Sequence, residues 1–370
     1  MERNYVTLAI HTYSFASALK KLLEKHGIPV QLENVNIANP EPACGIRVRI
    51  PQDELPKALT IVESSASLSP SAIEMEFEGV QNKMLVPVDF SDTSLEACRV
   101  AFDFAQALKL HPVILHVYAT PYFDSSLSST DSFTLDVRDA EARKSLESSA
   151  RYEMKRFCAR LDAMMADGLL PAIRYSTLLN EGMPEEAILS FTRQTPPELV
   201  VMSTRNADKR SRELIGSVTA EVVDSCRVSV LTWPAGTDYE PLDRLTRSVF
   251  FCNIDQNDLL AMDMYIRLFN DMPLHITLVP VADKSGSKST GRLSSLLRYF
   301  RQNYPQCEFD SFVADAPVFR EQLEPWAAGE GIKLIVVPNK KKNIFARLFN
   351  PGMAHRVVFD SNLPMLALPV

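Results

Sequence analysis

The residues best suited to bind a ligand lie between Glu198 and Pro234. An apolar run from Leu199 to Met202 has the length and the valine content of a buried parallel strand. A polar, basic loop follows, and Gly216-Ser217 begins an amphipathic helix. A strand, a loop and a helix N-terminus together present backbone N–H groups and the positive end of a helix dipole, which is an arrangement that binds phosphate.

The same stretch resembles the nucleotide loop of the universal stress protein family. That loop reads Gly, two residues, Gly, nine residues, Gly, then Ser or Thr. The spacing is kept here by Ser203, Asn206, Gly216 and Ser217, although serine and asparagine replace the first two glycines. Other stretches occur in the family's order: VPVDFSDTS (86–94), ILHVY (114–118), EGMPEEAIL (181–189), ELVVMST (198–204) and LIGSV (214–218). The resemblance covers residues 83–370 and is strongest up to residue 234.

The resemblance implies an adenosine-binding α/β fold and a set of nucleotide contacts. In such domains an acid after the first strand and a residue after the second hold the adenosine, while the loop encloses the phosphates. Carried over residue by residue, these positions are Asp89, Val117, Met202, Ser203, Asn206, Gly216, Ser217 and Val218. One hypothesis is therefore a switch that binds ATP or AMP in the first α/β copy.

The same residues also permit a purely structural interpretation. Asp89 can accept a turn hydrogen bond ahead of its helix, and Ser217 can be an N-cap. Asn206 adopts positive φ at low cost, but a side chain at Ser203 would crowd a phosphate or strain the turn. We favour this interpretation, in which the loop is degraded and no cofactor is expected.

From residue 83 onward, strands and helices alternate in the order of a parallel, doubly wound sheet. The order occurs twice, and a repeat of about 150 residues indicates a domain duplication. The first set of strands is predicted at 84–89, 113–117, 173–179, 199–202 and 228–231. After a linker at 234–245, the second set is predicted at 249–255, 276–281, 309–313, 334–337 and 365–368. The predicted domains are residues 81–236 and 246–370.

The second copy keeps little of the nucleotide loop. Pro338 and Lys341 occupy the first two glycine positions, and Met353 follows Gly352, which comes one residue later than in the first copy. Proline fixes φ where the freedom of glycine was needed. Asp255 is predicted to keep the acid after the first strand, but we expect this site to be lost. The basic run Lys340–Lys342 is interpreted as a solvated loop.

Residues 1–80 are predicted to form a separate small domain. Strands are expected at 5–10, 30–35 and 46–50, with helices capped by Ser14 and Asp53. The order βαββα, closed by a strand at 73–77, suggests a ferredoxin-like module.

Composition excludes several classes of function. A net charge of -7 argues against a general nucleic-acid binder, and no apolar run approaches the length of a membrane span. The six cysteines are scattered singly, which fits reduced thiols better than a disulfide framework or a zinc site, so we expect a cytoplasmic protein. His116 has no nucleophile at motif spacing, and no metal-ligand cluster is present, so no enzyme is expected.

The two strands at 228–233 and 366–370 each end a copy and would be exposed edges if unpaired. In the resembled family such last strands pair between subunits, so we expect these two to pair as an intramolecular pseudo-dimer. The function expected is that of a tandem universal stress protein that acts in stress response through unidentified protein partners. Homo-oligomerisation is a further expectation.

Overall fold

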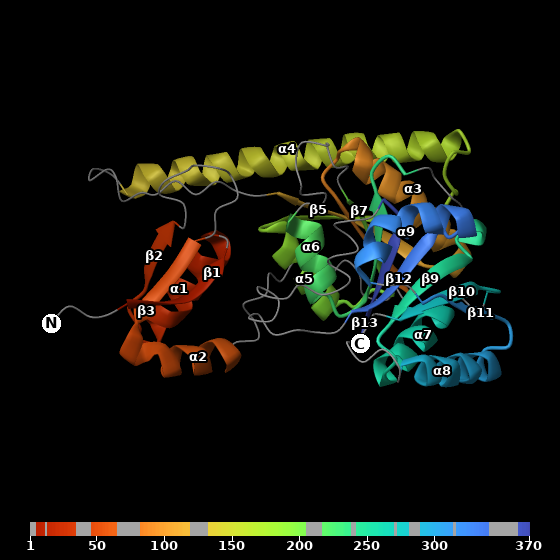
Figure 1. Ribbon diagram of the computed structural model, residues 1–370. Coiled ribbons are helices and arrows are strands. Elements are labelled where there is room, and N and C mark those ends of the chain that lie inside the picture. The colour runs from red at the N-terminus through yellow and green to blue at the C-terminus, as the bar shows by residue number, and fades with distance from the viewer. Residues whose placement is uncertain are drawn as a thin grey trace. The chain divides into compact units, whose positions relative to one another are not determined.

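The computed structural model describes residues 5–11, 13–34, 46–64, 82–118, 132–204, 217–237, 242–269, 272–280, 289–313, 316–339 and 362–370 (Figure 1). Within these residues the strands form one three-stranded sheet and one ten-stranded sheet.

The three-stranded sheet is formed by β1 (Tyr5–His11), β2 (Gln31–Asn34) and β3 (Ile46–Pro51), in the order β1-β3-β2. Both strand pairs are antiparallel. Helices α1 (Tyr13–Lys25) and α2 (Leu55–Ser64) share a hydrophobic core with the sheet. The buried residues of this core are apolar and come from both helices, from β3 and from the segment between α1 and β2: Ala16, Leu19, Leu23, Ile28, Val30, Val48, Ile50 and Ala58.

Two cap predictions in this region are wrong. Ser14 lies inside α1, which begins one residue earlier, and Asp53 lies in a short 3-10 helix, Gln52–Glu54, ahead of α2. The apolar periodicity located both helices, but the residues that begin them differ from those predicted. The closing strand predicted at 73–77 lies outside the described residues.

The ten-stranded sheet has the order β11-β10-β9-β12-β13-β8-β7-β4-β5-β6. Its first five strands in the chain are β4 (Lys83–Val88), β5 (His111–Tyr118), β6 (Ser176–Glu181), β7 (Leu199–Thr204) and β8 (Ser229–Pro234). The other five are β9 (Arg247–Cys252), β10 (His275–Pro280), β11 (Glu308–Ser311), β12 (Leu334–Asn339) and β13 (Met365–Pro369). Counted outward from the centre, both halves give the same order: last strand, fourth, first, second, third.

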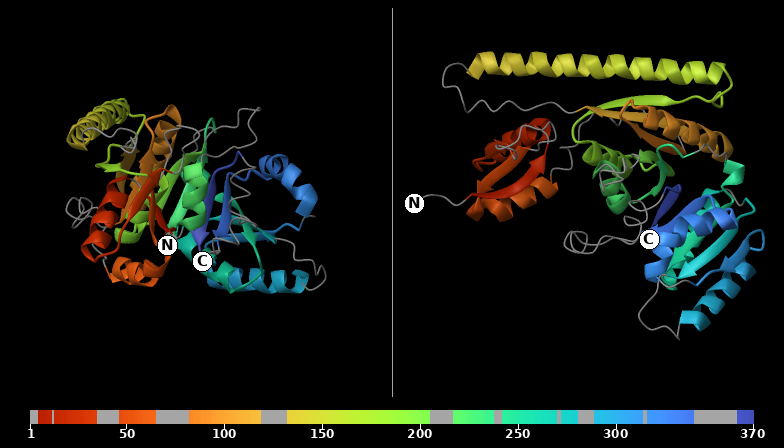
Figure 2. Two further views of the ribbon diagram at one scale, coloured as in Figure 1. Left: turned by 90° about the vertical axis from the view of Figure 1, so that its left-hand side faces the viewer. Right: turned by 45° about the horizontal axis from the view of Figure 1, so that its top comes forward.

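The helices that connect these strands are amphipathic or buried along one side. They are α3 (Asp92–Leu108), α4 (Ser132–Ala166), α5 (Pro184–Gln194), α6 (Ser217–Ser225), α7 (Gln256–Leu268), α8 (Ser289–Asn303) and α9 (Ala316–Glu330). In the second half, α7 and α8 cover one face of the sheet and α9 covers the other (Figures 1 and 2). This is the two-sided cover that a parallel sheet with apolar strands requires.

The third strand differs from its prediction. β6 begins at Ser176, whereas the predicted strand begins at Ile173. Tyr175 explains the difference, because its ring packs 5.5 Å from the ring of Phe102 and its hydroxyl donates to Asp162 at 2.8 Å. Tyr175 is thus held by side chains of α3 and α4.

The centre of the sheet is an antiparallel ladder between β8 and β13, where Met365 lies opposite Thr232 and Leu366 opposite Leu231. The β7–β8 and β12–β13 pairs on either side of it are parallel. The strand residues at the ladder are buried, including Trp233, which is 1% exposed. The pairing of these two final strands agrees with the expectation from the sequence.

Side chains on both sides of the ladder join the two halves. The Asn339 amide, itself buried, donates to the carbonyl oxygen of Val223 at 2.5 Å. That carbonyl lies in the last turn of α6, where helix carbonyls lack a partner within the helix. The rings of Phe104 and Phe269 meet edge to face at 5.9 Å. Apolar packing and a helix-capping amide therefore support the strand ladder.

We predict that Asn339→Ala lowers the free energy of unfolding by about 1–3 kcal/mol, because it leaves a buried carbonyl without its donor. Urea unfolding followed by circular dichroism measures the change. Asn303→Ala is the matched control, since its exposed amide bonds the carbonyl of Tyr299 within α8. An Asn339→Ala midpoint equal to that of the control would contradict the role assigned to this amide.

Candidate functional site

The best candidate position lies where β4 ends. Asp89 follows the strand directly, Phe90 has a left-handed backbone with φ of 64°, and Ser91 caps α3. β4 has β5 on one side and β7 on the other, so the strand order reverses beside it. Open α/β sheets bind ligands at the carboxyl end of such a switch point.

The Asp89 carboxylate is already engaged by the turn. Its Oδ1 accepts from the backbone N–H of Ser91 at 3.1 Å, from the Ser94 hydroxyl at 2.6 Å and from the Ser91 hydroxyl. The backbone N–H of Asp89 in turn donates to the Ser94 hydroxyl at 3.0 Å. Partial burial would raise the pKa of Asp89, but these hydrogen bonds outweigh it and hold the pKa below its usual value. The turn hydrogen bond expected from the sequence is therefore present.

The other predicted residues that are described lie on β5, β7 and α6. Val117 is half-buried near the end of β5, and Met202 is buried in β7. Ser203 is the penultimate residue of β7, and its carbonyl accepts from the Thr219 hydroxyl in α6 at 3.3 Å. Ser203 is paired in the strand with Trp233 and has no positive φ, so the strain predicted for its turn is absent.

The helix after the loop begins where the sequence predicts. Ser217 and Val218 are the first two residues of α6. Asn206 and Gly216 lie outside the described residues, as do Lys340–Lys342, Gly352 and Met353 of the second half. The structure thus places the two ends of the loop, at Ser203 and Ser217.

The second half repeats the turn with different residues. Ile254 has a left-handed backbone with φ of 58°, as Phe90 has with φ of 64°. The next residue, Asp255, caps α7 in a capping box with Asp258. The backbone N–H of Asn253 donates to Asp258 Oδ1 at 3.3 Å, which matches the bond from Asp89 to Ser94. Asn253 therefore corresponds to Asp89, and Asp255 corresponds to Ser91.

The prediction that Asp255 keeps the acid is therefore wrong. The error came from the strand end, because β9 stops at Cys252 and not at Asp255. The signal that would have shown it is the pair of acids three residues apart, which is typical of a capping box. Burial raises the pKa of Asp258, although backbone N–H bonds oppose the shift.

Comparison with known proteins agrees with this geometry: residues 81–234 match the universal stress protein family. These residues form a universal stress protein domain.

Related proteins extend the comparison. A universal stress protein of Methanocaldococcus jannaschii is 23% identical over 155 residues, which are 42% of this chain and 82% of that protein. The crystal structure of a universal stress protein from Archaeoglobus fulgidus has a TM-score of 0.51 at 14% identity, covering 78% of this chain and 98% of that one. This likeness shows that the α/β fold continues beyond the matched domain. A universal stress protein in complex with cAMP is 24% identical and covers 41% of this chain and 95% of that one, with a TM-score of 0.29.

Among the described cysteines, Cys98, Cys226, Cys252 and Cys307 are buried and Cys158 is half-buried. Burial raises the pKa of Cys98 and Cys226, and it raises the pKa of Cys252 to about 12. Such thiols are protonated at neutral pH and are poor nucleophiles.

His116 lies half-buried on β5. In the described part of the chain, no group of three or more His, Cys, Asp or Glu residues is arranged to hold a metal ion. Nor is any described helix long and apolar enough to cross a membrane.

The lowered pKa of Asp89 predicts a pH dependence of stability. Its hydrogen bonds stabilise the fold fully above the usual pKa of an aspartate, and this contribution is lost as pH falls through the lower pKa of the folded state. Asp89→Asn should therefore flatten the acid side of the stability profile. Thermal midpoints measured from neutral to strongly acid pH test this, with Asp167→Asn in an exposed turn as the control. Superimposable wild-type and Asp89→Asn profiles would refute it.

Proposed function

We propose that the chain is a tandem universal stress protein that acts in stress response through protein contacts and not through catalysis. Two α/β units, residues 81–236 and 246–370, form an intramolecular pseudo-dimer, and residues 1–80 add a ferredoxin-like module. The proposal rests chiefly on the mirrored strand order about the β8–β13 ladder.

The mirrored order supports duplication because both halves use the same path through the sheet. Each half also has a left-handed residue after its first strand, a side-chain cap on the next residue and the same bond from the strand end into the helix. A pairing of last strands within one chain covers two edges that would otherwise attract other strands. The order β1-β3-β2 with antiparallel pairs supports the ferredoxin-like assignment of the N-terminal residues.

Loss of nucleotide binding is supported by the residues at the ends of the loops. In the first half, Asp89 Oδ1 is occupied by three donors, and serine stands where the family loop has its first glycine. In the second half, Asn253 replaces the acid and Pro338 lies in β12 at the position of Ser203. The two sites have therefore diverged in the residues that would contact adenosine and phosphate.

A nucleotide switch is the second candidate, and two observations favour it. Asp89 is an exposed residue at the switch point, and the three donors that its carboxylate has within the described part of the chain all bond Oδ1, which leaves Oδ2 to accept from a ligand. The N-terminus of α6 lies at Ser217, where backbone N–H groups are oriented for phosphate. The adenine nucleotides ATP, AMP and cAMP are the ligands to test.

A thermal-shift titration separates the two candidates. If the loop is degraded, Mg-ATP, AMP and cAMP should leave the melting temperature of the full chain unchanged, because a ligand stabilises only through its affinity for the folded state. Ser203→Gly with Asn206→Gly should restore binding of Mg-ATP. Ligand at ~100 times its dissociation constant then adds about 2.7 kcal/mol of stability.

The matched control changes the second copy. Pro338→Gly with Lys341→Gly should remain without response, because that loop is one residue longer and lacks the Gly-Ser pair. A nucleotide-induced shift in the wild-type chain that disappears in Asp89→Ala would refute the degraded loop and establish the switch.

A further inference from the structure

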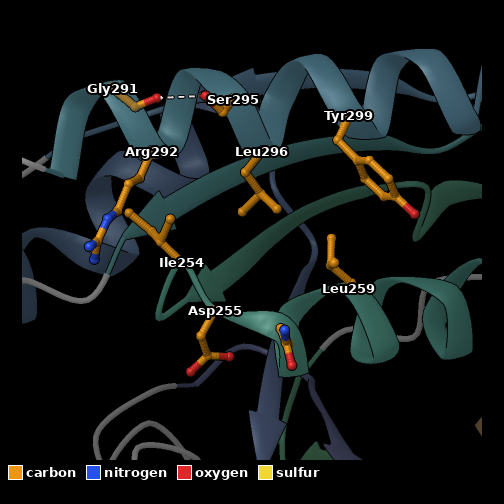
Figure 3. A pocket seen from close by; sticks show the side chains of 9 residues that line it. Ile254, Asp255, Leu259, Gly291, Arg292, Ser295, Leu296 and Tyr299 are labelled. Carbon is orange, nitrogen blue, oxygen red and sulfur yellow. Dashed lines mark hydrogen bonds between the residues drawn. The ribbon is translucent and has the colours of Figure 1, made fainter.

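The second half contains cavities of a size that binds small molecules, which is roughly 300–1,000 Å³. One of about 550 Å³ lies between α8 and the start of α7, where Leu259 and Leu296 point toward one another (Figure 3). Another of about 520 Å³ is lined mainly by residues of β9, β10, β11 and α9, with Arg301 from α8. Most residues of this second lining are polar, and we call it the polar cavity.

Two histidine contacts align the first half with the polar cavity. His111 and His275 are the first residues of β5 and β10, the second strand of each half. Each ring bonds the first residue of the third strand: Ser176 Oγ at 2.8 Å in the first half and Glu308 Oε2 at 3.0 Å in the second. Residues at equal distances along the strands from these contacts therefore correspond.

The corresponding strand residues differ in polarity. Two residues beyond the histidine contacts, the first half has Val113 and Leu178, which are buried. The second half has Thr277, which is half-buried, and Asp310, which is exposed. Thr277 and Asp310 lie opposite each other in the β10–β11 ladder, and both line the polar cavity. A closed apolar surface in the first half is therefore a polar, open one in the second.

The aromatic side chains of α5 and α9 differ in the same way. The backbone N–H groups of Glu198 and Lys333 donate to the carbonyl of the first residue of β4 and of β9, which aligns the fourth strands. Seven residues earlier, Phe191 is fully buried in α5, whereas Trp326 is half-buried in α9. The Trp326 ring stacks on that of Phe312 at 4.7 Å, and both residues line the polar cavity. The cavity thus has an aromatic wall next to its polar strand residues.

Several polar groups of the cavity have binding capacity left. Within the part of the chain that the structure describes, the hydroxyl or carboxyl groups of these lining residues have no partner: Thr277, Ser311 and Glu330. Asp310 Oδ2 bonds His275 Nε2 at 2.8 Å, and Oδ1 has no donor among the described residues. Each of these groups is able to bond a ligand without losing a contact of the fold.

The charges around the cavity favour a neutral ligand that carries hydroxyl groups. Arg247 donates to the carbonyl oxygen of Glu330 at 2.7 Å. Arg301 donates to that of Phe309 at 3.2 Å. The carboxylates of Asp310 and Glu330 balance these two cations, so a charged ligand would meet groups of its own sign. A hydroxyl group donates to a carboxylate and accepts from an N–H. The face of an aromatic ring has negative charge density, against which the C–H groups of a sugar ring pack.

We propose that the polar cavity binds a neutral monosaccharide or disaccharide. The hydroxyl groups of the sugar bond Thr277, Asp310 and Glu330, and the C–H face of one sugar ring packs on Trp326. The cavity is formed by the second half, whereas the nucleotide position at Asp89 lies in the first, so the proposal is independent of the function proposed above.

Saturation-transfer NMR of the full chain with neutral sugars tests this proposal. The probes are D-glucose, D-galactose, D-mannose, sucrose and trehalose, and at least one of them should show saturable binding. For the sugar that binds best, analogues that carry an amino group or a carboxylate should each bind at least about tenfold more weakly, because each adds a charge. Absence of saturable binding by all the sugars would overturn the proposal, as would equal affinity for a charged analogue.

Variants locate the site. Thr277→Val combined with Asp310→Leu and Trp326→Phe restores the residues of the first half and should abolish binding. Glu330→Gln removes an unpaired carboxylate and should weaken binding about tenfold. Thr277→Val alone removes one hydroxyl at nearly the same size and should weaken binding about two- to tenfold. Glu198→Gln is the control, because it changes an exposed acid of the first half outside the cavity and should leave affinity unchanged.

Circular dichroism shows whether each variant is folded. A folded triple variant that binds the sugar as tightly as the wild-type chain would refute binding at this cavity. If the triple variant does not fold, unchanged affinity in both Glu330→Gln and Thr277→Val refutes it. A loss of affinity in Glu198→Gln equal to that in Glu330→Gln would refute it as well.

Discussion

Unpaired strand edges are the constraint on which the rest of this structure depends. A parallel sheet of five strands that ends in an apolar last strand exposes a row of backbone donors and acceptors. Here β8 and β13 meet as an antiparallel pair, so each covers the edge of the other. The buried residues of both strands, the amide of Asn339 and the edge-to-face contact of Phe104 with Phe269 all follow from that meeting. A single sheet therefore runs through both halves of the α/β chain.

The same backbone turn is stabilised by different side chains in the two halves. A left-handed residue and an N-cap follow the first strand in each, because the chain must reverse from strand to helix over three residues. In the first half, the residue at the strand end is the acid Asp89, which exchanges hydrogen bonds with the Ser94 hydroxyl. In the second half, the residue at the strand end is Asn253, and its backbone N–H donates to Asp258. Side chains beside the turn then differ, since Phe90 packs on the ring of Phe157 in the first half, whereas Ile254 lines a pocket in the second.

Sequence reasoning recovered the strands of the sheet because buried parallel strands are continuous apolar runs. Val-rich segments such as Leu199 to Met202 have few alternative structures. The predictions were wrong where side-chain contacts decide the end of a strand. Tyr175 was predicted to lie in a strand but packs on Phe102 of α3. Asp255 was predicted to be the acid at the end of a strand but is the N-cap of α7. The turn at Asp89 was predictable from its local hydrogen-bonding pattern. The pocket between α7 and α8 was not, because it depends on how the side chains of two helices pack and not on a local pattern.

The most direct test of the account is a cross-link across the central ladder. Val230 and Ala367 lie opposite each other, and opposed residues of an antiparallel pair are about 4.5–5.5 Å apart between Cα atoms, a distance that a disulfide spans. Mild oxidation of the double variant Val230→Cys, Ala367→Cys should give a monomeric product in which one peptide joins positions 230 and 367, whereas the single variants should not. Failure to form that link, or formation of it only between two chains, would contradict an intramolecular pairing of the two halves.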